Sequence, residues 1–93
     1  RDMNLTFEKV GSLYEATFNA TAAFNLHIER PVGGLLEIKQ RTPSAGQFAL
    51  IDDLRFAEGK IVLDLDFTGG IFPKDIKVVS ASKPSMAFVT FAE

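Results

Sequence analysis

Few residues of this chain could carry out chemistry, and His27 is the first of them. It is the only histidine, and an imidazole can act as a general base or as a metal ligand near neutral pH. His27 stands at a polar position of an alternating stretch, near Asn25 and Glu29, which favours a side chain on the solvent face of a strand. The chain has no cysteine, no second histidine and no serine in a nucleophile elbow. We therefore expect no nucleophilic relay.

Asp64 and Asp66 are the second group of interest. They lie two residues apart, so both point to the same face of a strand. Together with Asp52, Asp53 or Asp75 they could offer oxygen ligands to calcium, but calcium motifs place their ligands in a loop. Paired carboxylates also serve glycoside hydrolysis, although nothing in so short a chain predicts a cleft. We expect charges that keep an outer face soluble, with no catalytic residue, no metal ligand and no cofactor.

The composition of the chain limits which classes of protein it could belong to. The 93 residues make one domain, residues 1–93, of ordinary hydrophobic content and a net charge of −2. Basic residues are spread singly, which argues against nucleic-acid binding, and no apolar run has the length of a transmembrane segment. A small domain without disulfides is typical of bacterial envelope proteins, so we expect an extracellular or cell-envelope location. The first residue is Arg1, which is compatible with a mature secreted protein and with an excised domain.

Alternating apolar and polar residues from Tyr14 to Ile28 are the clearest structural signal. The stretch is too long for one straight strand, since strands usually run about five to ten residues. We expect a break near residues 20–23, either a bend that carries the chain between two sheets or a tight hairpin. Similar patterns predict strands at about 3–7, 36–41, 60–67, 76–80 and 86–92.

Seven or eight short strands separated by turn residues predict an all-β fold, an immunoglobulin-like β-sandwich. An α+β alternative has one helix at about 45–58 packed on an antiparallel sheet, because Ser44 and Gln47 fit a capping box. In the preferred strand interpretation, the chain turns at residues 52–53, and residues 54–56 form a hairpin with the strand after Gly59. Seven residues should be buried and face each other: Phe18, Phe24, Leu26, Ile61, Leu63, Leu65 and Phe67.

Two apolar features exceed what one core requires. Phe72 lies at a turn, and the last strand, residues 86–92, is apolar on both faces. We expect this strand to be integral to the fold, with Phe88 in the main core and Phe91 nearer the surface. An apolar strand can also bind another chain, so Phe72, Val89 and Phe91 are candidate contacts with another protein or domain.

These patterns favour a domain that is not an enzyme. We expect a non-catalytic structural or adhesion-type β-sandwich domain of a secreted or cell-envelope bacterial protein. The alternative is a ligand-binding module for a glycan or other surface polymer. Sugar-binding platforms are usually flat aromatic side chains, but the chain has no tryptophan and its one tyrosine, Tyr14, stands at an apolar position of the alternating stretch.

Overall fold

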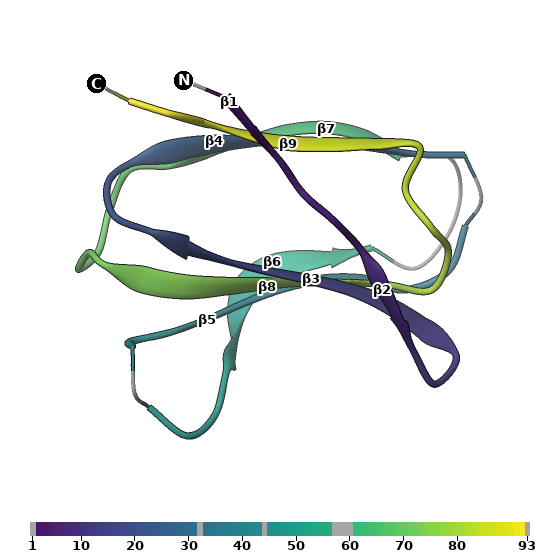
Figure 1. Ribbon diagram of the computed structural model, residues 1–93, viewed down its shortest axis with the longest axis horizontal. Coiled ribbons are helices and arrows are strands. Elements are labelled where there is room, and N and C mark those ends of the chain that lie inside the picture. Colours follow the sequence, from purple (N-terminus) through teal and green to yellow (C-terminus); the bar gives the residue numbers. More distant parts are fainter. Residues whose placement is uncertain (1, 32, 44, 57–60, 93) are drawn as a thin grey trace.

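The predicted β-sandwich is confirmed by the computed structural model, which describes residues 2–31, 33–43, 45–56 and 61–92, and only the backbone of residues 51–56. Within these ranges there is no helix, and nine strands form two antiparallel sheets packed face to face (Figure 1). The strands are β1 (Asp2–Asn4), β2 (Glu8–Val10), β3 (Leu13–Ala20), β4 (Phe24–Arg30), β5 (Leu36–Arg41), β6 (Ala49–Phe56), β7 (Ile61–Phe67), β8 (Lys74–Ser80) and β9 (Met86–Phe91).

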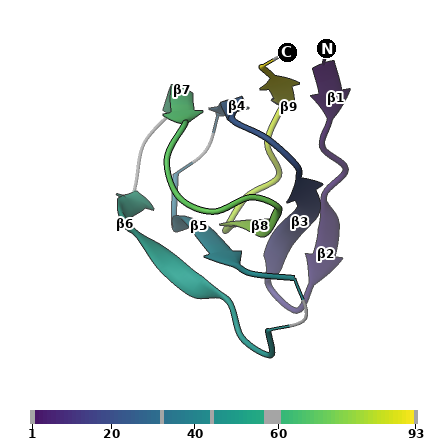
Figure 2. The same cartoon turned by 90° about the vertical axis from the view of Figure 1, so that its left-hand side faces the viewer.

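The strand order defines the connectivity. One sheet has the order β1-β9-β4-β7 and the other β2-β3-β8-β5-β6, as the end-on view in Figure 2 shows. Hydrogen-bonded partners are nested along the chain: β5 pairs with β6, β4 with β7, β3 with β8 and β1 with β9. Nested pairs folded across two sheets make a jelly roll, here with the short β2 added at one edge. The two-sheet architecture is shared with immunoglobulin-like domains, whose strand order differs.

The long alternating stretch forms β3 and β4, one in each sheet. Residues 21–23 carry the chain from the five-stranded sheet to the four-stranded sheet, so the expected bend is confirmed and the hairpin alternative is wrong. Because both strands keep the same alternation, their even-numbered residues face the space between the sheets. The buried apolar ones are Ala16, Phe18, Ala20, Phe24, Leu26 and Ile28, and Arg30 at the end of β4 is also buried.

Residues 49–56 form a strand, so the alternative with a helix at about 45–58 is wrong over these residues; residues 57 and 58 lie outside the described part. The expected hairpin with the strand after Gly59 is also wrong. β6 pairs instead with β5, where Phe56 lies opposite Leu36, while β7 belongs to the other sheet. The expected turn at residues 52–53 is replaced by a shift in the pairing register. Glu37 of β5 pairs with Arg55, whereas Lys39, only two residues later, pairs with Leu50.

The core lies between the two sheets and contains four of the seven expected residues in buried positions: Phe18, Phe24, Leu26 and Ile61. The other three, Leu63, Leu65 and Phe67, pack against the core but are only partly buried. β7 is the edge strand of its sheet, which explains their remaining exposure. The ring of Phe18 meets Phe24 edge-on across the sandwich at 5.3 Å, whereas Phe24 stacks on Phe67 of the adjacent strand at 4.7 Å.

The last strand is integral to the fold, as expected, because β9 lies between β1 and β4. Its inward residues, however, are Ala87, Val89 and Phe91, and Val89 is fully buried. The prediction that Phe88 belongs to the main core is wrong. The register with β4 places Phe88 opposite His27 on the outer face, while Phe91 turns inward, 6.2 Å from the ring of Phe24.

A buried arginine holds the connection between β4 and β5. The Arg30 guanidinium donates to the carbonyl oxygens of Gly34 at 2.7 Å and Leu35 at 2.8 Å, and to Ser80 Oγ at 3.2 Å. Burial lowers the pKa of Arg30. Gly34 has φ +106°, and a Cβ there would lie 2.7 Å from the Ala81 Cβ. Arg30 and Gly34 together close this end of the core.

Candidate functional site: the outer face around His27

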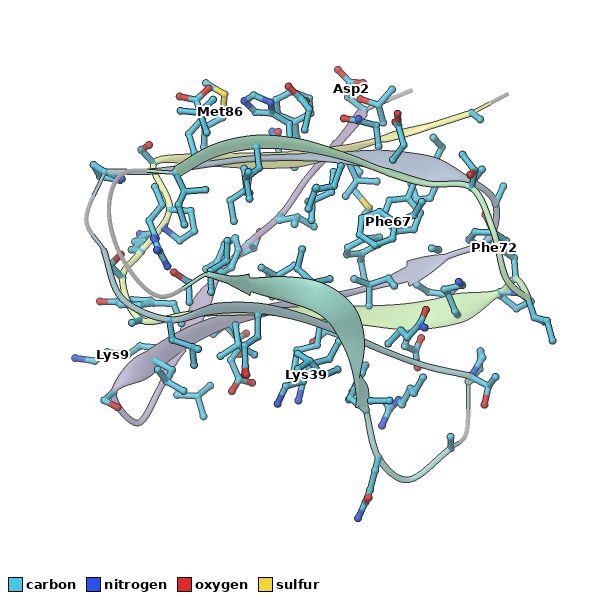
Figure 3. All side chains as sticks on the ribbon, turned by 180° about the vertical axis from the view of Figure 1, so that it is seen from behind. Asp2, Lys9, Lys39, Phe67, Phe72 and Met86 are labelled. Atoms are coloured by element: carbon cyan, nitrogen blue, oxygen red, sulfur yellow. The ribbon has the colours of Figure 1, made fainter. Side chains whose placement is uncertain are left out.

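The outer surface of the four-stranded sheet carries the only histidine and is here called the His27 face. Figure 3 shows Met86 and Asp2 on this surface, Phe67 between the sheets and Lys39 on the opposite surface. The strand registers bring together the outward residues of four strands. These are Asp2, Asn4, Met86, Phe88, Thr90, Asn25, His27, Glu29, Val62, Asp64 and Asp66.

His27 lies between two carboxylates. Its Nε2 is 2.8 Å from Glu29 Oε2, and its Nδ1 is 2.9 Å from Asp64 Oδ1. Glu29 is two residues further along β4, and Asp64 is the register partner on β7. The ring also stacks on Phe88 with centroids 4.9 Å apart. Three strands therefore fix the position and orientation of the imidazole.

This geometry favours the protonated imidazole. A neutral ring has one N–H donor, whereas an imidazolium has two, and an ionised carboxylate only accepts. Both short contacts are hydrogen bonds only when His27 carries its second proton. The hydrogen bond to Glu29, followed by the one to Asp64, raises the pKa of His27 above its ordinary value of 6.5.

The His27 face combines acidic and apolar side chains. It carries Asp2, Glu29, Asp64 and Asp66, and the described outward positions of its strands hold no lysine or arginine. Met86 is 48% exposed and Val62 is 55% exposed. The opposite sheet differs, because its outer face carries lysine and arginine as well as carboxylates, in three ion pairs: Lys39 with Glu37, Arg41 with Asp75, and Lys77 with Glu15.

The acidic residues on this face do not assemble into a chelating group. Asp66 accepts a hydrogen bond from the Asn25 amide at 3.0 Å, and the two partners of His27 bind opposite sides of its ring. Asp75 lies on the other sheet, where Asn19 and Arg41 lower its pKa. The described residues contain no group of three or more His, Asp or Glu side chains placed to hold a metal ion. The side chains of Asp52 and Asp53 lie outside the described part.

The three candidate contacts predicted from the sequence, Phe72, Val89 and Phe91, lie in or against the core. Val89 is fully buried, and Phe91 is partly buried against the core. Phe72 is also partly buried, with the Lys74 ammonium 4.6 Å from its ring centroid. A partner role for these residues stays a prediction. The exposed Val62 and Met86 were not predicted as contacts from the sequence, although both stand at outward positions of their strands.

A second candidate lies at the end of the sandwich that carries both the β5–β6 and the β7–β8 connections (Figure 1). The hollow has a volume of about 410 Å³. Its lining includes Gln40, Arg41 and Thr42 from the end of β5 and the loop after it, and Gly70, Ile71 and Lys74 from the β7–β8 loop and the start of β8. Lys74 was not predicted from the sequence as a site residue. The feature that could have identified it is its charge at an inward position of an alternating strand.

Comparison of the chain with protein-family models, with curated proteins and with solved structures found no match. The described residues contain no helix that is long and apolar enough to span a membrane.

Proposed function

We propose that this chain is a non-catalytic structural or adhesion domain of a secreted or cell-envelope bacterial protein, and that it contacts a basic protein partner through the His27 face. The observation that carries the proposal is the combination of exposed Val62 and Met86 with four carboxylates on one sheet surface. Apolar side chains gain free energy when a partner covers them, and the carboxylates favour a partner rich in lysine or arginine.

A non-catalytic role is supported by the position of His27. Both ring nitrogens contact carboxylates of the same face, so neither is directed at a substrate. A hollow of about 240 Å³ at the end of this sheet is lined by Asn25, Asp66 and Phe91 among others, and His27 is not one of its lining residues.

The test compares two double variants of equal composition. Val62→Ser with Asp66→Lys alters the His27 face, and Val10→Ser with Glu8→Lys makes the matched change on β2 of the other sheet, where both residues are exposed. The probe is an immobilised copolymer of lysine and leucine, and the readout is surface plasmon resonance. We expect at least about tenfold weaker binding for the first variant and little change for the second, since tenfold corresponds to about 1.4 kcal/mol.

Equal losses in both variants would show that net charge alone governs binding and would refute the proposed face. Unchanged binding in both would refute it as well. The proposed location has its own test, which is immunodetection of the domain in fractionated source cells. Detection only in the cytosolic fraction would contradict a secreted or cell-envelope protein.

A ligand-binding module is the second candidate function, and a separate observation favours it. The hollow beside Lys74 offers polar side chains and a buried cation at one end of the sandwich.

A further inference from the structure

The cation in the second hollow has an unusual set of partners. Lys74 is the first residue of β8, at an inward position, and only 8% of it is exposed. Its ammonium donates to Gln40 Oε1 at 3.2 Å and to the Gly69 carbonyl oxygen at 3.3 Å, and it lies over the Phe72 ring. All three partners are neutral, and no carboxylate of the described residues pairs with this cation.

The contacts of Lys74 are loose. Charge-assisted N–H···O bonds usually measure about 2.7 to 2.9 Å. Arg30, a second buried cation, reaches that range through both terminal nitrogens, which donate to two carbonyl oxygens of the chain, although its Nε has no partner. Lys74 stays 0.3 to 0.4 Å beyond the long end of that range, and its ammonium has a third donor that neither contact uses. A carboxylate could therefore replace one long neutral contact with a shorter ionic one.

The surroundings of Lys74 leave room for such a group. A Cβ at Gly70 would lie 2.9 Å from Lys74 Nζ, so the absence of a side chain at this position keeps the space beside the ammonium open. Arg41 adds a second positive charge to the lining, although its Nε binds Asp75 Oδ2 at 3.1 Å. No carboxylate lines the hollow among the described residues, whose charged side chains there, Arg41 and Lys74, are both positive.

We propose that this hollow binds an acidic sugar, with the carboxylate of a uronate residue on Lys74. Gln40 and Thr42 line the same space, and amide and hydroxyl groups suit ring hydroxyl groups. Ile71, a lining residue, is 77% exposed and offers an apolar surface to the C–H groups on one face of the sugar ring. The volume of about 410 Å³ lies in the usual range for small-molecule sites. This site is separate from the His27 face and goes beyond the contact role proposed above.

The test titrates the domain with digalacturonate and follows amide chemical shifts by NMR. We expect shifts centred on residues 40–42 and 69–74, and at least about tenfold weaker binding in Lys74→Met. The matched control is Lys39→Met, which removes the same charge from an outward position of β5. Ile71→Ser is a second variant, which changes an exposed side chain of the hollow and leaves Lys74 in place.

Neutral digalactose and an acetylated dipeptide with a free carboxylate serve as comparison ligands. Equal binding of digalactose would overturn the role of the carboxylate, and equal binding of the dipeptide would overturn the assignment to a sugar. Equal affinity of the wild type, Lys74→Met and Ile71→Ser would overturn the site itself. Binding to the lysine–leucine copolymer is unaffected by Lys74→Met if the two sites are independent, which separates a failure here from a failure of the proposed contact face.

Discussion

Replacing Phe24 by alanine tests the inward-facing assignment of the two central strands of the four-stranded sheet. Phe24 is 3% exposed, and its ring contacts Phe18, Phe67 and Phe91 at centroid distances between 4.7 and 6.2 Å. Phenylalanine-to-alanine changes in a core cost about 3 to 5 kcal/mol, because the lost transfer free energy is joined by the cost of a cavity. A chain of this length has a total stability of roughly 5 to 14 kcal/mol.

Phe88→Ala is the matched control, since it makes the same change on the adjacent strand but on the outer face. Phe88 is partly exposed and has the His27 ring as its stacking partner, so we expect a loss of about 1 kcal/mol. With an m-value of about 1.3 kcal/mol/M, the urea midpoint falls by about 3 M for Phe24→Ala and by less than about 1 M for Phe88→Ala.

Urea unfolding followed by circular dichroism measures both midpoints. A loss in Phe88→Ala that equals or exceeds the loss in Phe24→Ala would show that the inward and outward faces are assigned wrongly. If Phe24→Ala is too unstable to fold, the pair Phe24→Leu and Phe88→Leu keeps the comparison, with smaller losses in the same order.

Two further predictions concern the titration of His27 and the turn at Gly34. The pKa of His27 is raised in the folded chain, so the stability that its proton contributes is fully present below pH 6.5 and is lost as the pH rises through the folded-state pKa. An NMR titration of this single imidazole, with urea unfolding at about pH 6 and about pH 9, measures both quantities, and His27→Gln should abolish the stability difference. A folded-state pKa at or below 6.5 would contradict the two carboxylate contacts. Gly34→Ala should cost about 1 to 3 kcal/mol from backbone strain alone, whereas Gly46→Ala, where a Cβ meets nothing within 4 Å, should change the urea midpoint little. Equal midpoints for these two variants would refute the close approach of Gly34 to Ala81.

Alternation in the sequence was sufficient to predict β3, β4 and a break between them. A period of two has one physical cause, which is an extended chain with one face in the core, and the small residues at 20–23 mark the break. They do not distinguish a bend between two sheets from a hairpin, which only the strand pairing decides. The last strand lacked this information. Because β9 is apolar at both parities, the sequence pattern does not distinguish Phe88 from Phe91, and only the register with β4 does.

The sequence could not predict which strands pair with each other. The expected hairpin of residues 54–56 followed the rule that consecutive strands are often neighbours. In this fold β6 and β7 are consecutive but lie in different sheets, and β7 pairs with β4. The candidate site has the same limitation. Glu29 beside His27 follows from their spacing on one strand, whereas Asp64 reaches His27 only through a register between residues 37 positions apart.

The nested strand order has a consequence for folding during synthesis. β5 and β6 are consecutive in the chain, so they can pair soon after β6 has been synthesised. β1 has its described partner in β9, where Asn4 lies opposite Phe88, so it has no strand to join until the end of β9 has been made. At typical synthesis rates these two residues are made about 4 to 17 s apart. Throughout that interval the inward side chain of Met3 lacks its native cover, and the nascent chain exposes a segment on which a chaperone could act.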